Sequence, residues 1–332
     1  MKLLSISIPT YNRNDIVINQ LEQLYQIIIA DNLIDFVEIV ITDNSSSDAT
    51  FESLINFKNT HRQIDIKIFK NQSNIGIDGN IHKAVLNSSS EYVHILSDDD
   101  FVDRQFYSIL INFLKANSVS FLFLDPKRFT NHGKGITASV STLSKNKFHH
   151  VSVDELFLII GHWLTFVSSY VVSRDFWCAR EYKIKRYHGT DILLCHAMAE
   201  IIKNDRNKIY ICTFNSIVAN PMYTGSFRLF NAFAKSWQDF LIQSIDLFEL
   251  KNTGKVVFKK TVKYFLPACV RIAKVDRLFK LSDVIFLIKH CYSYHEFWIW
   301  VFPEIIIPTK ISQIYIKLKG FLYEIIQNVK NS

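Results

Sequence analysis

The sequence predicts an α/β fold, with a mostly parallel sheet flanked by helices and followed by a helical C-terminal region. Over residues 1–125, short apolar runs alternate with helical stretches through short links, which is the pattern of right-handed βαβ units. From residue 227 onward, the apolar residues take helical spacing and mix with lysine and arginine. With 332 residues and an apolar fraction of 48%, the chain is long enough for two domains, which we expect at residues 1–226 and 227–332.

Each expected strand in the first part is a short apolar run that ends at turn-forming residues. The run at residues 36–42 is almost continuously apolar, which is typical of a strand buried on both faces of a parallel sheet. Asn14 or Asp15 is expected to cap the first helix, because both side chains accept backbone N–H bonds. The expected strands are residues 3–8, 36–42, 64–69 and 91–96, and the expected helices are residues 16–30, 49–59, 77–86 and 103–116.

The middle of the chain has less regular periodicity. Residues 125–150 are polar and rich in Gly, Ser, Thr and Lys, which predicts a mobile loop of the kind that often covers a site. A helix is expected at residues 192–202, with Thr190 or Asp191 near its cap. The remaining expected elements are a helix at residues 154–160 and strands at residues 119–124, 165–173, 208–214 and 216–219.

An acidic cluster follows the strand expected at residues 91–96. Asp98, Asp99 and Asp100 carry three like charges side by side, so a fold keeps them only where a cation, backbone N–H groups or a helix N-terminus offsets the repulsion. Carboxylate oxygens suit Mg²⁺ or Mn²⁺, which bind through one or two carboxylates together with substrate phosphates. The alternative is a solvated group of helix-capping residues.

Three other polar loops also follow expected strands, at residues 9–14, 43–48 and 74–80. The carboxyl ends of parallel strands meet at one edge of a sheet, so these loops and the acidic cluster are expected to form one site. Asp43 is expected to accept hydrogen bonds from a nucleobase or ribose, with a plain turn as the alternative. The third loop holds Gly76 but lacks the G-x-G-x-x-G pattern, which argues against nicotinamide binding.

Asp191 is flanked in the sequence by His188 and His196, and these three residues are candidate site residues. Each of these residues also has a structural explanation. Asp191 can cap the helix that follows, and a histidine beside a helix is more often a packed structural residue than a catalyst.

Four segments, in this order, resemble the motifs of family-2 glycosyltransferases. They are SIPTYNR at residues 7–13, ITDNSSSD at residues 41–48, NIG at residues 74–76 and SDDD at residues 97–100. The resemblance covers roughly the first 125 residues and implies the type-A nucleotide-sugar transferase (GT-A) fold, which is Rossmann-like. The chain length and the helical tail resemble enzymes that build bacterial O-antigen or capsule repeat units.

The resemblance also implies a role for each matching residue. Asn44 departs from the second acidic residue that many members carry, and the missing Q-x-x-R-W motif argues against a processive polymerase. The implied nucleotide-sugar ligands are Pro9, Thr10, Tyr11 and Arg13 for the nucleotide, Asp43 for the base, Asn74 and Gly76 for ribose and phosphate, Asp98 on the ribose side with Asp99 beside it, and Asp98 and Asp100 for the metal. The chain lacks a clear Glu-Asp pair at the family's usual general-base position, so Asp191 is the best remaining candidate for that role, with His188 and His196 as alternatives.

The implied reaction is an inverting, metal-dependent transfer of one sugar from a nucleoside-diphosphate sugar to an acceptor hydroxyl. Mn²⁺ or Mg²⁺ is the expected cofactor, and a lipid-linked saccharide is the expected acceptor, in surface polysaccharide synthesis. Two alternatives remain open at this point. One is a nucleotidyltransferase acting on sugar phosphates, and the other is a non-catalytic membrane-binding or partner-binding module on a degenerate transferase fold.

The C-terminal third carries the net positive charge of the chain, with 16 Lys and Arg residues against 8 Asp and Glu from residue 227 to the end. This excess points to an anionic partner. Trp298, Trp300 and Phe302, with Lys310, Lys317 and Lys319 nearby, favour peripheral contact with an anionic membrane over nucleic acid. The alternative is a helical core with a solvated basic face.

The expected location is the cytoplasm, at the inner face of the bacterial inner membrane. The five cysteines have no metal-ligand or C-x-x-C spacing, so we expect reduced thiols. The first residues have the polar interruptions of a strand rather than the pattern of a signal peptide, and no run of apolar residues reaches the length of a membrane span.

Overall fold

The computed structural model describes residues 2–128, 142–203, 205–214, 216–219, 228–250, 252–311 and 314. The described residues divide into two compact units, one up to Ala219 and one from Arg228 onward. Most of the loop expected at residues 125–150 lies outside the described residues.

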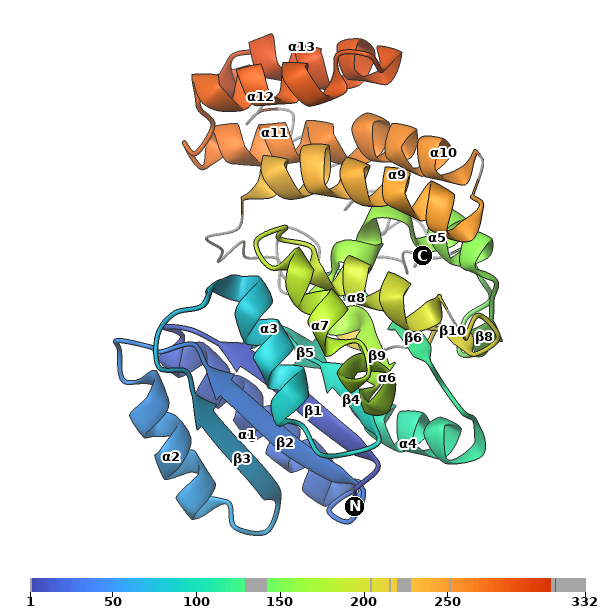
Figure 1. The fold of residues 1–332 in the computed structure, drawn as a ribbon. Coiled ribbons are helices and arrows are strands. Elements are labelled where there is room, and N and C mark those ends of the chain that lie inside the picture. The colour runs from blue at the N-terminus through green and yellow to red at the C-terminus, as the bar shows by residue number, and fades with distance from the viewer. Residues whose placement is uncertain are drawn as a thin grey trace, which may run out of the picture. The chain divides into compact units, whose positions relative to one another are not determined.

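An eight-stranded sheet forms the centre of the first unit (Figure 1). Its first four strands run parallel to one another. Beyond them, β9 and β8 are antiparallel to their neighbours, whereas β6 and β10 are parallel to each other, so the sheet is mixed. This confirms the expected mostly parallel α/β architecture. In spatial order the strands are β3 (Asp65–Lys70), β2 (Val37–Asp43), β1 (Leu4–Thr10), β4 (Tyr92–Ile95), β9 (Tyr170–Ser173), β6 (Phe121–Leu124), β10 (Ile209–Cys212) and β8 (Phe148–His150).

Helices cover both faces of this sheet (Figure 1). Apolar side chains at i, i+3 and i+4 spacing explain why they pack there, as Val17, Leu21, Leu24 and Ile28 do along α1. A small second sheet has the order β5 (Phe101–Val102), β11 (Ile217–Ala219) and β7 (Lys127–Arg128). The helices are α1 (Asn14–Ala30), α2 (Thr50–Thr60), α3 (Gly76–Asn87), α4 (Phe106–Ala116), α5 (Val153–Ile160), α6 (Arg174–Cys178), α7 (Glu181–Ile184) and α8 (Leu193–Ile202), with 3-10 turns η1 (Gly161–Thr165), η2 (Val167–Ser169) and η3 (Lys185–Tyr187).

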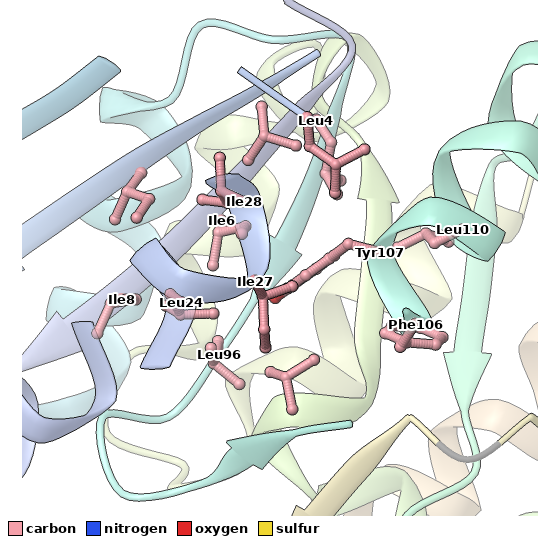
Figure 2. Packing of buried hydrophobic residues seen from close by; sticks show 14 of the residues in the cluster. Leu4, Ile6, Ile8, Leu24, Ile27, Ile28, Leu96, Phe106, Tyr107 and Leu110 are labelled. Carbon is pink, nitrogen blue, oxygen red and sulfur yellow. The ribbon is translucent and has the colours of Figure 1, made fainter. Parts of the chain in front are cut away.

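The main core lies between the parallel strands and the helices α1, α2 and α4. Leu4, Ile6 and Ile8 alternate along β1 and are fully buried, so they present one face of that strand to the helices. Figure 2 shows these side chains beside α1, with Tyr107 of α4 close by. Helix α3 lies on the opposite face of the sheet (Figure 1). The helices on the two faces of the sheet keep the carboxyl ends of the strands aligned at one edge.

Two expected helix caps are wrong. Helix α1 begins at Asn14 with Arg13 in the cap position, and neither Asn14 nor Asp15 makes a capping bond. Helix α8 begins at Leu193 without a side-chain cap from its own segment. Its first N–H is satisfied instead by Asp78 of helix α3, a residue far away in sequence.

The strand expected at residues 165–173 is shorter than predicted. Only β9 is extended, and the residues before it form the turns η1 and η2. The reason is that Ser168 bonds outward from its turn, with its carbonyl near His94 and its hydroxyl near Asp100. These contacts replace the sheet bonds that a longer strand would have made.

The second unit is helical, as its periodicity predicted. Pro267 and Pro303 lie in the first turns of their helices, where the missing N–H costs nothing. Gly254 lies in the first turn of α10, where a Cβ would come within 2.8 Å of Ile245. The helices are α9 (Trp237–Phe248), α10 (Thr253–Lys260), α11 (Leu266–Val275), α12 (Leu281–Cys291) and α13 (Phe302–Ile306), with π-helical turns η4 (Asn231–Ser236), η5 (Thr261–Phe265) and η6 (Phe297–Val301).

Every helix in the described part of the chain is too short or too polar to cross a lipid bilayer.

A buried carboxylate joins the strands at the edge opposite the acidic cluster. Glu38 of β2 is 1% exposed, forms an ion pair of 2.6 Å with Lys67 of β3, and accepts hydrogen bonds from Ser5 and Ser89. Burial alone would raise the pKa of Glu38, but the bonds from Lys67, Ser5 and Ser89 outweigh it and lower the pKa to about 2. The ionised form therefore stabilises the fold.

We expect Glu38→Gln to lower the free energy of unfolding at pH 7 by about 2–3 kcal/mol. Because the pKa in the folded state lies below the usual value of 4.5, the stabilisation is complete above that pH and declines as the pH falls toward about 2. The stability gap between wild type and variant, measured by urea unfolding, should therefore shrink in acid. Glu52→Gln, at an exposed position of α2, is the control and should change little. A gap that is independent of pH would contradict the assignment.

Candidate functional site

The four polar loops meet at the carboxyl edge of strands β1 to β4. The backbone N–H of Asn44 donates to the carbonyl of Thr10, and that of Asn71 donates to the carbonyl of Asp43. The Thr10 hydroxyl donates to Asp98 Oδ2 at 2.7 Å, which joins the β1 loop to the acidic cluster. The structure thus confirms that the loops converge, as the parallel-strand rule predicted.

Arg13 offsets the charge of the acidic cluster. Its Nη1 lies 2.7 Å from Asp98 Oδ1 and 2.8 Å from Asp99 Oδ2, so one guanidinium bridges two neighbouring carboxylates. Asp98 is 4% exposed. Burial raises the pKa of Asp98 to about 6, although Arg13 and Thr10 favour the ionised form.

Two serine hydroxyls orient the other carboxylates of the cluster. Ser97 Oγ donates to Asp99 Oδ1 at 2.6 Å, and Ser168 Oγ donates to Asp100 Oδ2 at 2.5 Å. Ser168 Oγ also accepts the backbone N–H of Ser97 at 2.9 Å. Gln20 of α1 donates to the carbonyls of Ser97 and Asp100 and so fixes the backbone of the cluster. Gln20 and Ser168 were not predicted, because no local motif marks them.

The carboxylate pair Asp98 and Asp100 is suited by its chemistry to Mg²⁺ or Mn²⁺. Both residues are buried, and protein hydroxyl groups hold one oxygen of each in place. The part of the chain that is described contains no group of three or more His, Cys, Asp and Glu side chains arranged around an ion. Two carboxylates are enough when diphosphate oxygens complete the coordination, so the donor set fits such a metal.

Asn44 is the centre of a network of amide bonds in the predicted nucleotide loop. Its Nδ2 donates to Asn74 Oδ1 at 2.9 Å and to the Gly76 carbonyl at 3.3 Å. Its Oδ1 accepts from Asn71 Nδ2 and from the Ile75 backbone N–H, each at 3.0 Å. Both donor and acceptor atoms are needed at this position, which explains why an amide stands where many family members carry an acid.

Asp43 is fully buried and holds its own turn together. Both carboxylate oxygens accept the Ser46 N–H at 3.2 Å, and the Ser46 hydroxyl also bonds to Asp43. Ser46 in turn accepts the Asn12 N–H at 2.8 Å, which attaches this turn to the β1 loop. The plain turn explanation therefore applies to Asp43, and its contact with a nucleobase stays a prediction.

The remaining predicted nucleotide ligands lie on the rim of the same edge. Tyr11 is 41% exposed, and Asn74 and Gly76 are also exposed. Gly76 has φ of +77°, a backbone conformation that a Cβ would strain. Pro9 is partly buried at the end of β1. These residues surround the buried cluster.

The loop before α8, which carries the candidate base, is bound by a residue of helix α3. Asp78 Oδ2 accepts the backbone N–H of Gly189 at 2.8 Å and that of Asp191 at 3.0 Å, while Asp78 Oδ1 accepts that of Leu193 at 3.4 Å. Asp78 is 4% exposed, and burial raises its pKa even though the three N–H groups favour the ionised form. Asp78 was not predicted as a site residue, since its partners are over a hundred positions away.

The two candidate histidines differ in burial, since His196 is 5% exposed and His188 is exposed, but each contacts another ring. His188 Nε2 lies 3.1 Å from His82 Nδ1 of α3, and His196 stacks on Tyr187 with ring centroids 4.0 Å apart. Burial lowers the pKa of His82 to about 4 and also lowers that of His188. The imidazoles of His82 and His188 are therefore neutral at neutral pH, and Nε2 of His188 is paired with Nδ1 of His82.

The first half of the chain is similar in sequence to known glycosyltransferases. The sequence model described as "Glycosyl transferase family 2" matches residues 5–156. Abequosyltransferase RfbV of Salmonella typhimurium is 31% identical over 121 residues, which is 36% of this chain and 35% of that protein. A Kelch repeat and BTB domain-containing protein of Ectromelia virus is 26% identical over 258 residues, which is 76% of this chain and 39% of that protein. The chain thus spans less than half of these curated relatives.

Two solved structures share the fold. Staphylococcus aureus TarS 1–349, in complex with UDP-GlcNAc, has a TM-score of 0.62 and 14% identity, covering 87% of this chain and 79% of that one. Mannosyltransferase PcManGT of Pyrobaculum calidifontis, in complex with GDP-Man and Mn²⁺, has a TM-score of 0.52 and 13% identity, covering 96% of this chain and 86% of that one. The fold is therefore GT-A, as predicted.

We expect Asn44→Asp to destabilise the site more than its conservative chemistry suggests. A carboxylate has no donor for Asn74 Oδ1 and the Gly76 carbonyl, so two acceptors would face a negative charge. The expected loss in free energy of unfolding is about 1–3 kcal/mol, measured by chemical denaturation. Asn56→Asp, at an exposed position of α2, should be close to neutral. Equal stability of Asn44→Asp and wild type would refute the network.

Proposed function

Because residues 5–156 form a domain of glycosyl transferase family 2, we propose that the protein moves one sugar from a nucleoside-diphosphate sugar to a saccharide acceptor. The observation that carries the proposal is the convergence of four strand-end loops on a buried acidic cluster. Similarity to an abequosyltransferase supports a role in building a bacterial surface polysaccharide, either O-antigen or capsule. UDP-GlcNAc and GDP-Man in the structural neighbours support a nucleotide-sugar donor.

The donor nucleotide is proposed to lie across the ends of β1, β2 and β4. Side chains and backbone groups on the rim would contact it, and the buried network behind them would hold the rim in position. In this assignment Asp43 lies near the base, and Asp98 lies on the ribose side. The proposed rim contacts are Pro9, Thr10, Tyr11, Arg13, Asn74, Gly76 and Asp99.

Asp98 and Asp100 are proposed to hold Mn²⁺ or Mg²⁺ together with the donor diphosphate. When bound, such a cation neutralises charge that develops on the departing diphosphate. Arg13 contributes positive charge at the same place, because its guanidinium already bridges Asp98 and Asp99. Ser168 and Gln20 would keep the cluster from shifting as the ligands change.

Asp191 is proposed to accept the proton of the acceptor hydroxyl as general base. An attack from the face opposite the diphosphate then inverts the anomeric centre. His188 and His196 are assigned supporting roles instead, because the first pairs with His82 and the second stacks on Tyr187.

The acceptor is proposed to be linked to lipid, with residues 227–332 as a membrane-associating region and residues 1–226 as the catalytic region. The side chains of Tyr264, Trp298, Ile299 and Trp300 in the second unit are each at least 45% exposed, and they are proposed to form an aromatic surface. Lys263 Nζ lies 4.9 Å from the ring centre of Tyr264 and 5.3 Å from that of Trp300. Aromatic rings with a lysine suit a membrane interface that bears anionic lipid.

Through this surface the protein is proposed to associate with the cytoplasmic face of the inner membrane. Lys317 and Lys319 lie outside the described residues. Lys310 lies within them and is exposed. No contact with nucleic acid is proposed.

We expect Asp100→Ala to lose metal-dependent donor binding while keeping the fold. In wild type, one of UDP, GDP, CDP and ADP should raise the melting temperature further when Mn²⁺ is present, since ligand binding stabilises the native state. Asp100→Ala should lose that Mn²⁺-dependent increment and slow sugar transfer by about a hundredfold or more. Asp35→Ala, at an exposed position, should keep both. Transfer by Asp100→Ala at the wild-type rate would exclude the metal assignment.

We expect the second unit to bind anionic lipid through its aromatic surface. Wild-type protein should sediment with phosphatidylglycerol-containing vesicles, less so at high salt, and hardly at all with phosphatidylcholine alone. Trp298→Ser combined with Trp300→Ser should weaken this binding by about tenfold, because both rings lose their place in the interface. Tyr182→Ser removes an aromatic side chain 65% exposed in the first unit and should have no effect. Unchanged binding by the double variant would place the membrane contact elsewhere.

A further inference from the structure

Helix α3 connects the proposed nucleotide loop to the proposed base loop. Its first residue is Gly76, whose carbonyl accepts a hydrogen bond from Asn44. Asp78 lies two residues further and binds the backbone of the segment from Gly189 to Leu193. The two loops come from opposite halves of the first unit in sequence, yet both are attached to the first turn of one helix.

The contact continues along one face of α3. Asp78 and His82 are four residues apart, so their side chains lie on the same face of the helix. His188 pairs with His82, and the next residue, Gly189, donates its N–H to Asp78. The base loop therefore rests on two successive turns of α3 rather than on a single bond.

The bonds to Asp78 stabilise an unusual backbone. Gly189 has φ of +86° and Asp191 has φ of +65°, both in the left-handed region. For a residue with a Cβ, such as Asp191, this conformation costs about 1 kcal/mol or more and persists only where its surroundings enforce it. A carboxylate that accepts the N–H groups at 189, 191 and 193 supplies that enforcement.

The buried charge of Asp78 has no other evident use in the described part of the chain. It is 4% exposed, and it accepts its hydrogen bonds from the N–H groups of the base loop at Gly189, Asp191 and Leu193. Burying a carboxylate costs free energy unless hydrogen bonds compensate it, so a link with only a structural role would not need a charged side chain here. The geometry instead matches a residue that sets where Asp191 is held.

We infer that Asp78 is a positioning residue for the transfer reaction. Its carboxylate fixes the backbone on either side of Asp191 and ties that backbone to the helix turn that follows the nucleotide loop. This inference rests on the proposed function, because it takes Asp191 as the base. It adds a residue that does not itself touch donor or acceptor and that acts through Asp191.

The test uses Asp78→Asn in the full chain, with steady-state transfer kinetics and hydrogen exchange. The variant keeps the size of the side chain but loses its charge, so the N–H groups at 189, 191 and 193 lose a strong acceptor. We expect kcat to fall by about tenfold to a hundredfold, as displaced catalytic groups do, while KM for the donor stays within about twofold. Backbone exchange over residues 188–194 should become faster.

Three further variants test whether the loss of kcat arises from Asp78 acting through Asp191. Glu38→Gln removes another buried carboxylate of the same unit, away from the site, and should lower stability while leaving kcat and exchange at 188–194 unchanged. Asp191→Asn should bind donor normally and transfer poorly. Asp78→Asn combined with Asp191→Asn should be no slower than Asp191→Asn alone, because the two residues act as one unit.

The outcomes separate the inference from the proposed function. Wild-type kcat in Asp78→Asn, together with slow transfer by Asp191→Asn, overturns the positioning role and leaves the function intact. Wild-type kcat in Asp191→Asn overturns both the base assignment and the inference. Failure of wild-type protein to bind any of UDP, GDP, CDP and ADP with Mn²⁺ overturns the proposed function itself.

Discussion

The bridge from Arg13 to Asp98 and Asp99 is the interaction on which the site depends. Three adjacent carboxylates at the end of a buried strand repel one another, and burial makes that repulsion stronger. A single guanidinium from the neighbouring β1 loop offsets it and fixes the distance between two loops at the same time. Hydroxyl groups of Thr10 and Ser168 then set the direction of the carboxylates that Arg13 does not fully constrain.

Amide side chains organise the other side of the site in a similar manner. Asn44 satisfies donors and acceptors from four residues of the next loop, and Asn80 of α3 donates to the carbonyls of Thr10 and Thr42. Loop backbones at a strand edge have unpaired polar groups, which cost free energy when they are buried without partners. The amides supply those partners, so the loops can be ordered without forming regular secondary structure.

The sequence predicted the strands and their shared edge because periodicity and turn residues are local signals. It therefore placed Thr10, Asp43, Asn74 and Asp98 near one another correctly. It missed Gln20, Ser168 and Asp78, whose partners lie 77, 68 and 113 residues away and leave no local pattern. The caps expected from Asn14 or Asp15 and from Thr190 or Asp191 failed for the same reason, since tertiary partners outcompeted the local ones.

The family match ends at residue 156 and therefore contains only part of the proposed site. Residues 5–156 contain the nucleotide loops and the acidic cluster, whereas Ser168 and the base loop at 188–193 lie beyond that segment. The proposed donor side is built on parallel strands, whose pairing fixes where each loop begins. The later segment is built from short turns and helices, and the loop before α8 is held by the carboxylate of Asp78, a residue inside the matched segment. The matched segment therefore orders the proposed base loop as well as its own loops.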